Sequence, residues 1–283
     1  MPFLILFFST ALLVFFIYQY LLRKLTRHRP QNFPQKGKIT HNKEKITVIC
    51  VGDSITHGNV SANYVEMLER WLGQDYFLYN AGVNSDLTYT LLRRLEDVIT
   101  TNPDFIILLI GTNDLNATLS KAALRRYRQF GKIQPEEVPC LEDFQRNYTA
   151  IVQRLKKETK AAIMLLSLPV ISEDLREEAN QQADRYSKFI KELSEKEELR
   201  YVPVRETMKA YLRNHPKKER YQFKDTIKLM YFSIIRHELL GQDWNTICAA
   251  HNRDLTQDNL HFNTRGAAMI ASLVEQEIIN YKP

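Results

Sequence analysis

Cysteine is scarce in this sequence, and the three residues, Cys50, Cys140 and Cys248, lie far apart. Three scattered thiols exclude a disulfide-stabilised scaffold, and their spacing does not match that of a zinc site. Cys50 stands within a strongly apolar run, so we expect it to be a buried structural thiol. The odd number of cysteines favours a reducing compartment.

A basic surface is also missing from most of the chain, although the formal net charge is +6. Residues 1–45 contain eight of the 39 Lys and Arg residues but only one of the 33 acidic residues. The remainder of the chain is therefore close to neutral. Proteins that bind nucleic acids through surface charge normally carry a basic stripe on the folded domain. We therefore expect no nucleic-acid partner.

No charged residue occurs from Pro2 to Leu22, where the sequence is PFLILFFSTALLVFFIYQYLL. A helix of this length spans about 30 Å, the thickness of the hydrocarbon core of a bilayer. A cleaved signal peptide would begin with basic residues, have a shorter apolar stretch and end in a small-residue cleavage site. The sequence before Arg23 shows none of these three features. We therefore expect residues 1–22 to form one transmembrane anchor. The positive charges that follow place the rest of the chain on the cytoplasmic side.

The rest of the chain divides into a linker and one α/β domain. Residues 23–45 are polar, contain two prolines and show no apolar period, which is typical of a linker. From residue 46 to 283, short apolar runs alternate with helical patterns, which predicts a parallel sheet covered by helices on both faces. The expected strands are Ile46–Val51, Tyr76–Tyr79, Phe105–Ile110, Ala162–Leu168 and Tyr201–Val204. The expected helices are Tyr64–Leu72, Leu87–Ile99, Phe144–Leu155, 173–196 and Ala267–Ile279.

Polar segments lie at the ends of the first three expected strands. They read GDSITHG at residues 52–58, NAG at 80–82 and GTND at 111–114, and a fourth segment, DNLH at 258–261, lies near the C-terminus. Ligands of parallel sheets bind beyond the carboxyl ends of the strands. We therefore expect these four segments to meet at one edge of the sheet.

Together, the four segments resemble the sequence blocks of the SGNH, or GDSL-type, serine hydrolases. The resemblance runs from about residue 46 to 280, which is nearly all of the chain after the linker. It implies an α/β fold of the flavodoxin-like, three-layer α/β/α type, with a parallel sheet of about five strands. It also implies ester hydrolysis that requires no metal and no organic cofactor.

The same resemblance assigns roles to individual residues. It makes Ser54 the nucleophile, His261 the general base and Asp258 the residue that orients His261. The backbone N–H groups of Ser54 and Gly82 and the side-chain amide of Asn113 are expected to form the oxyanion hole. The chemistry fits, because a serine hydroxyl needs an adjacent base, and a carboxylate fixes the tautomer of the imidazole.

Neighbouring polar residues have simpler interpretations. We expect Asp53 and Asp114 to accept backbone hydrogen bonds within their loops. His57 is an alternative base, but it shares a tight loop with Ser54, and a structural role is the simpler interpretation.

Two positions depart from the family pattern. Many members have a second glycine a few residues after the one that matches Gly82, whereas residues 83–86 read VNSD. The last block usually reads Asp-Gly-x-His, and here Asn259 replaces the glycine. Asparagine tolerates a positive φ better than most residues, so we expect the turn to survive.

Two stretches, residues 115–140 and 215–257, are interpreted as insertions that overhang the site. Within the second, five apolar residues share one helical face: Ile227, Met230, Tyr231, Ile234 and Ile235. Such a face usually packs against a core. The alternative is an apolar lid that receives an acyl chain.

The sequence thus predicts a membrane-anchored serine ester hydrolase that acts through an acyl-enzyme on a lipid or other small acyl ester. Carbohydrate O-deacetylation and acyl transfer are alternatives within the same fold. A catalytically silent, membrane-tethered binding module is the alternative of another class, and the presence of every expected catalytic group argues against it. Many family members work outside the cytoplasm, which opposes the location that the charges favour.

Overall fold

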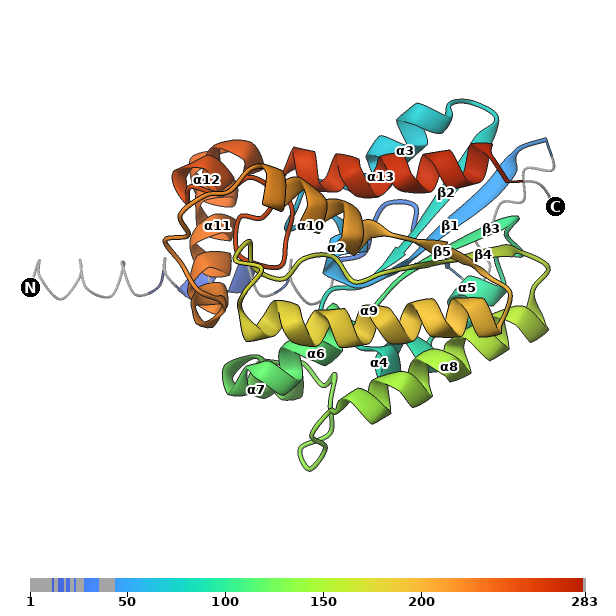
Figure 1. The fold of residues 1–283 in the computed structure, drawn as a ribbon, viewed down its shortest axis with the longest axis horizontal. Helices are drawn as coiled ribbons and strands as arrows, with labels where there is room; N and C mark the ends of the chain where they lie inside the picture. The colour runs from blue at the N-terminus through green and yellow to red at the C-terminus, as the bar shows by residue number, and fades with distance from the viewer. Residues whose placement is uncertain are drawn as a thin grey trace, which may run out of the picture.

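The computed structural model describes residues 12, 15–17, 19–20, 23, 28–35 and 44–281 of the chain. Its centre is a parallel sheet of five strands in the order β2-β1-β3-β4-β5, with helices on both faces (Figure 1). This is the flavodoxin-like strand order, and it confirms the predicted α/β fold with a parallel sheet. The strands are β1 (Ile46–Gly52), β2 (Tyr76–Gly82), β3 (Phe105–Leu109), β4 (Ala162–Leu166) and β5 (Arg200–Val202).

The central strands are apolar along almost their whole length because helices cover both of their sides. All residues of β3 are buried, as are all residues of β1 except Ile46. Parallel strands that are covered on both faces typically read as continuous apolar runs rather than as alternating patterns. This explains why the strands were the easiest elements to find in the sequence.

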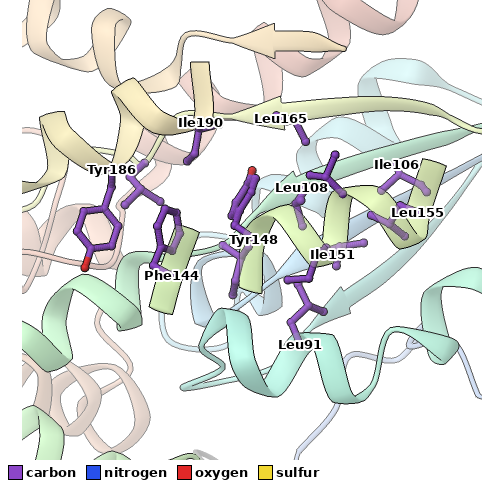
Figure 2. Close-up of a cluster of buried hydrophobic side chains, with 14 of the residues drawn as sticks. Leu91, Ile106, Leu108, Phe144, Tyr148, Ile151, Leu155, Leu165, Tyr186 and Ile190 are labelled. Carbon is purple, nitrogen blue, oxygen red and sulfur yellow. The ribbon is translucent and has the colours of Figure 1, made fainter. Parts of the chain in front are cut away.

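One face of the sheet is covered by α4 (Thr88–Arg93), α5 (Glu96–Ile99), α8 (Leu141–Glu158) and α9 (Glu178–Lys196). Figure 2 shows part of this core, with Ile106, Leu108 and Leu165 of the strands next to Ile151 and Leu155 of α8. Full burial of one such side chain contributes about 1.5–3 kcal/mol. The opposite face is covered by α3 (Tyr64–Leu72), α10 (Val204–Asn214) and α13 (Thr264–Ile279).

The expected helix over Leu87–Ile99 is interrupted, because Arg94 leaves helical geometry with a φ of −112°. Its guanidinium binds the Oδ2 of Asp86 at 2.6 Å and the carbonyl oxygens of Ala81 at 3.0 Å and Gly52 at 3.2 Å. Arg94 therefore ties the ends of β1 and β2 to the loop that follows β2. The apolar pattern over Leu87–Ile99 did not reveal this break, because α4 and α5 both bury apolar residues on the same side.

The two insertions form helices at the end of the molecule toward which the strands point (Figure 1). The first contains the end of α6 (Thr112–Leu119) and all of α7 (Lys121–Gln129). The second contains the 3-10 helix η1 (Phe223–Asp225), α11 (Thr226–Leu240) and α12 (Trp244–Ala250). The short helix α2 (Ser54–His57) lies at the same end.

Most of the expected anchor and much of the expected linker lie outside the described residues. Among the residues that are described, no helix is long and apolar enough to cross a membrane. Residues 28–35 of the expected linker run along the edge strand β2. The Asn32 side chain donates to the carbonyl of Leu78 at 2.6 Å, and the Asn32 carbonyl accepts from the N–H of Asn80 at 3.3 Å. This stretch therefore covers part of a sheet edge that would otherwise present unpaired backbone groups.

Candidate active site

Ser54 lies directly beyond the carboxyl end of the central strand β1. The strand ends at Gly52, and Asp53 caps α2 by accepting the N–H of Ile55 at 3.0 Å, as predicted. A Cβ on Gly52 would lie 2.3 Å from the carbonyl of Leu109, so only glycine lets the neighbouring strands approach this closely. Burial raises the pKa of the Asp53 carboxyl to about 7.

The structure brings Ser54, His261 and Asp258 into one chain of hydrogen bonds. The Oγ of Ser54 lies 2.9 Å from the Nε2 of His261, although 207 positions separate the two residues. The Nδ1 of His261 lies 2.7 Å from the Oδ2 of Asp258. The other carboxylate oxygen of Asp258 accepts the N–H groups of Leu260 at 3.0 Å and His261 at 2.8 Å.

The surroundings of His261 favour its protonated form. Burial opposes the charge on the imidazolium, but the nearby carboxylate of Asp258 and its hydrogen bond outweigh that effect. The pKa of His261 is therefore raised above its ordinary value, with a smaller contribution from Asp53. An imidazole in this setting can take a proton from a neighbouring hydroxyl and hold it.

Asn259 occupies the turn of the DNLH segment with a φ of 80°. The expectation that asparagine replaces glycine in a left-handed turn is therefore confirmed. Its side-chain amide also donates to the carbonyl of Gln222 at 3.1 Å and to the Oγ1 of Thr226 at 3.0 Å. These bonds fasten the segment that carries His261 to the start of α11, which a glycine would not do.

Asn113 is held by both ends of its side-chain amide. Its Oδ1 accepts from the hydroxyl of Tyr127 at 2.6 Å, and its Nδ2 donates to the carbonyl of Asp86 at 2.9 Å. Tyr127 in turn accepts from Asn116 at 2.8 Å. A side-chain amide has two N–H donors, so one remains after the bond to Asp86. Asn113 lines the same cavity as Ser54 and His261.

The structure does not bring Gly82 to this cavity. The N–H of Gly82 donates to the Oδ1 of Asn80 at 2.9 Å, and this N–H is therefore already used. A Cβ on Gly82 would lie 2.1 Å from the backbone nitrogen of His57, so the glycine is required for close packing against α2. The expected contribution of Gly82 to an oxyanion hole therefore has to be corrected.

Ser85, which the sequence analysis did not single out, lies in the cavity instead. It has a φ of 62°, a left-handed conformation that is uncommon for serine, and it lines the cavity together with Ser54 and Asn113. No hydrogen-bond partner of its N–H is found within the part of the chain that the structure describes. The signal in the sequence was the departure at residues 83–86, where many family members have a second glycine, because glycine is the residue that most readily adopts a left-handed conformation.

His57 and Asp114 have structural partners. The Nε2 of His57 lies 3.0 Å from the carbonyl of His28, and burial lowers the pKa of the ring to about 4. His57 does not line the cavity of Ser54. Asp114 accepts from the N–H of Thr88 at 3.0 Å, which joins the loops that follow β2 and β3, as expected of a loop-fixing residue.

The cavity next to Ser54 has a volume of about 60 Å³. Its lining combines polar side chains, among them Ser54, Asn113 and His261, with apolar side chains from both insertions: Ala123, Phe130, Ile227 and Met230. The five-residue apolar face expected in the second insertion is divided. Ile227 and Met230 line the cavity, Ile234 is buried, and Tyr231 and Ile235 are exposed.

A parallel α/β sheet with a serine, a histidine and an aspartate joined at its carboxyl edge defines the class of α/β serine hydrolases. Residues 50–269 match the model of the GDSL-like Lipase/Acylhydrolase family, and the chain belongs to that family. It is therefore a hydrolase of ester bonds. No curated protein sequence matches this chain.

Several solved structures share the fold. An acetyl xylan esterase, AlAXEase, is 22% identical, with a TM-score of 0.57 over 82% of this chain and 100% of its own. The acetylxylan esterase Axe2 from Geobacillus stearothermophilus is 18% identical, with a TM-score of 0.57 over 87% and 97% of the two chains. LAE5, an alpha/beta hydrolase from the metagenome of Lake Arreo, Spain, is 19% identical, with a TM-score of 0.56 over 83% and 97%.

Proposed function

We propose that this protein hydrolyses a small acyl ester with Ser54 as nucleophile, His261 as general base and Asp258 as the residue that orients the base. The observation that carries the proposal is the continuous set of hydrogen bonds from the Ser54 hydroxyl through the His261 ring to the Asp258 carboxylate. A serine hydroxyl becomes a competent nucleophile when a base within about 2.6–3.2 Å removes its proton.

The reaction then follows from the positions of these atoms. The Oγ of Ser54 attacks the ester carbonyl while the Nε2 of His261 takes the hydroxyl proton. The tetrahedral intermediate collapses, His261 gives its proton to the leaving alcohol, and an acyl-enzyme remains on Ser54. A water molecule that loses a proton to His261 cleaves the acyl-enzyme and restores the serine.

Three donors are proposed for the oxyanion hole. They are the backbone N–H groups of Ser54 and Ser85 and the remaining N–H of the Asn113 amide. Ser85 takes the role that the sequence analysis gave to Gly82, because the N–H of Ser85 has no other described use and the N–H of Gly82 donates to Asn80. Fixed donors of this kind stabilise the charge that develops on the carbonyl oxygen.

The size of the cavity favours a short acyl group. A water molecule needs about 10–15 Å³ of such space, so about 60 Å³ matches a group of a few heavy atoms, such as an acetyl group. The same observation supports carbohydrate O-deacetylation as a second candidate, since acetyl is the shortest common acyl group. The solved relatives whose titles name an acetyl xylan esterase are consistent with this candidate.

Membrane anchoring through residues 1–22, with residues 23–45 as a connecting segment, belongs to the same proposal. Its support is the uncharged stretch from Pro2 to Leu22 and its length. The positive charges after this stretch favour a catalytic domain on the cytoplasmic side.

A fluorophosphonate probe tests the catalytic assignment. We expect the wild type to be labelled and Ser54→Ala to remain unlabelled, with the same thermal unfolding midpoint in both. Labelling of Ser54→Ala would place the nucleophile elsewhere. An unlabelled wild type that remains folded would favour the binding-module alternative.

The acyl group is tested with p-nitrophenyl esters of increasing chain length. We expect kcat/KM to be highest for acetate or propionate and to fall for chains that exceed the cavity. A maximum at long chains would contradict the short acyl pocket.

A further inference from the structure

The helix α11 carries apolar residues on two opposite sides. Its inner side contributes Ile227 and Met230 to the cavity of Ser54 and buries Ile234. Its outer side exposes four apolar side chains, between 37% and 52% accessible, at positions that share one helical face: Tyr231, Phe232, Ile235 and Leu239. The inner side of α11 is already covered, so apolar side chains that gather on its outer side indicate a further contact, with another protein or with a membrane.

This outer face of α11 forms part of an uneven distribution of exposed apolar residues. Among the described residues, 13 large apolar side chains are exposed, and nine of them lie on α11 or on the N-terminal stretch from Leu12 to Tyr20. The other four, Ile46, Trp71, Val138 and Ile279, come from four separate segments. Single exposed apolar residues are ordinary, whereas a gathered set marks a surface of interaction.

The N-terminal stretch contacts α11 directly. Ile17 packs against the buried cluster of Val60 and Ile234, and Met230 of α11 packs against the same cluster. The hydroxyl of Tyr20 donates to the Oε2 of Glu238 at 3.2 Å. Val60 and Met230 also line the cavity of Ser54, so the segment expected to enter the bilayer lies beside the candidate active site.

We propose that the outer face of α11 is a bilayer-binding surface, which lies at the lipid interface next to the N-terminal anchor and presents the Ser54 cavity to esters held in the membrane. The proposal rests on the anchoring proposed above. A bilayer that holds residues 2–22 reaches α11 because Ile17 and Tyr20 already touch this helix. The exposed Lys228 on the same face, and Arg126, whose guanidinium lies 4.7 Å from the centre of the Tyr231 ring, fit the phosphates of lipid headgroups.

The location of this face is tested with the full chain reconstituted into mixed phosphatidylcholine and phosphatidylserine vesicles. An NBD fluorophore is attached to Phe232→Cys in a Cys140→Ser background, since Cys50 and Cys248 are buried. The matched control is Ile279→Cys, an exposed apolar position on α13. We expect blue-shifted emission and quenching by doxyl-labelled lipid at position 232 and neither effect at position 279.

Equal emission and equal quenching at the two positions would overturn the proposal. A second outcome would also overturn it: if position 232 is not quenched by lipid and the protein is cross-linked into a dimer through this position, a second copy of the chain covers the face. A full chain that fails to float with the vesicles would refute the anchoring and this surface together, whereas flotation without quenching at position 232 refutes only the surface.

Turnover supplies an independent test. We expect the double variant Phe232→Asp, Leu239→Asp to hydrolyse a diacylglycerol acetate held in vesicles at least about tenfold more slowly, because it loses apolar contact with the bilayer. Its rate on soluble p-nitrophenyl acetate should match that of the Ile279→Asp control, since neither residue lines the cavity. Equal rates on the vesicle substrate would contradict the proposal. A wild type without turnover on either ester would refute the proposed hydrolysis, while the fluorescence result would still decide the surface.

Discussion

Two regions surround the cavity of Ser54, and they are built on different principles. The rim consists of residues 52–54, 85, 111–114 and 258–261 at the carboxyl edge of the sheet. The roof consists of α7 and α11, which the two insertions supply. In the rim, the Asp258 carboxylate alone accepts three hydrogen bonds, and both ends of the Asn113 amide are bonded. The roof brings apolar side chains to the cavity, namely Ala123, Ile227 and Met230, beside the polar groups of Arg126, Tyr127 and Thr226.

Because of this difference, the rim is expected to control the rate of hydrolysis, and the apolar side chains of the roof are expected to control which ester is preferred. Hydrogen bonds to charged groups depend on direction and are expensive to break when they are buried, so the rim holds its atoms in one geometry. Apolar contacts have no preferred direction, and volume changes are accommodated in part. We therefore expect changes in the rim, and in the Tyr127 hydroxyl that holds Asn113, to lower turnover on every ester, whereas changes in the apolar side chains of the roof alter which ester is preferred.

The largest effect is expected for Asp258→Asn. The amide no longer fixes the imidazole tautomer or stabilises its charge, so kcat should fall by about 10⁴. The pH profile provides a second measurement. His261 must be neutral to act as a base, so the activity is lost as the pH falls through its pKa, which the Asp258 carboxylate raises. The residual activity of the variant should therefore persist to lower pH than that of the wild type. An unchanged acid limb would show that another group controls it.

Asn113→Ala should lower kcat by about 10²–10³, as expected for the loss of one oxyanion donor. Tyr127→Phe keeps that donor and removes only the hydroxyl that holds the Asn113 Oδ1, so its loss in kcat should be smaller. Steady-state kinetics on p-nitrophenyl acetate distinguishes the two variants. A loss in Tyr127→Phe equal to that in Asn113→Ala would mean that the hydroxyl itself takes part in the reaction.

A paired substitution separates packing from catalysis within the loop that follows β2. Gly82→Ala introduces a Cβ 2.1 Å from the backbone nitrogen of His57 and should lower the free energy of unfolding by about 3 kcal/mol. Ser85→Gly relieves the left-handed conformation and keeps the N–H, so its stability should change by less than about 1 kcal/mol and its activity should be retained. Denaturant unfolding and kcat/KM measure both properties. A large loss of activity in Ser85→Gly without a loss of stability would indicate a role for the serine hydroxyl.

The smallest effect is expected in the roof. Met230→Ala enlarges the cavity, so the ratio of kcat/KM for butyrate over acetate should rise by about 10-fold or less, as expected for one or two methylene groups. The rate on acetate should change little. An equal fall on both esters would show that Met230 supports turnover in general rather than the choice of acyl group.

The sequence predicted the sheet well because each strand carries its own signal. Val48 to Val51 and Phe105 to Leu109 are buried on both sides, and this burial requires continuous apolar runs. The helix over residues 87–99 was predicted in one piece, and its break at Arg94 was missed. The cause of the break is a set of bonds to carbonyl oxygens of two strands that are distant in sequence.

The candidate site was predicted in part. The expected meeting of Ser54, Asn113, Asp258 and His261 agrees with the lining of one cavity and the bonds of the rim. The sequence did not show whether Gly82 or Ser85 is the better candidate for an oxyanion-hole donor. The answer depends on the hydrogen bond that the Gly82 N–H already makes and on the positive φ of Ser85. The division of the α11 residues between cavity, core and surface was also missed. Helical spacing shows which residues share a face, but it does not show what that face contacts.

The sequence by itself determined the succession of strands and helices and the family, and it predicted the residues proposed to hydrolyse the ester, since local apolar patterns and short motifs encode these. Only the tertiary structure decided which backbone N–H beside Ser54 has no partner among the described residues, and which side of α11 meets the cavity. The physical reason is that hydrogen bonds and burial are exclusive: a donor that is already bonded, or a face that is already covered, is unavailable for anything else, and this depends on partners far away in the chain.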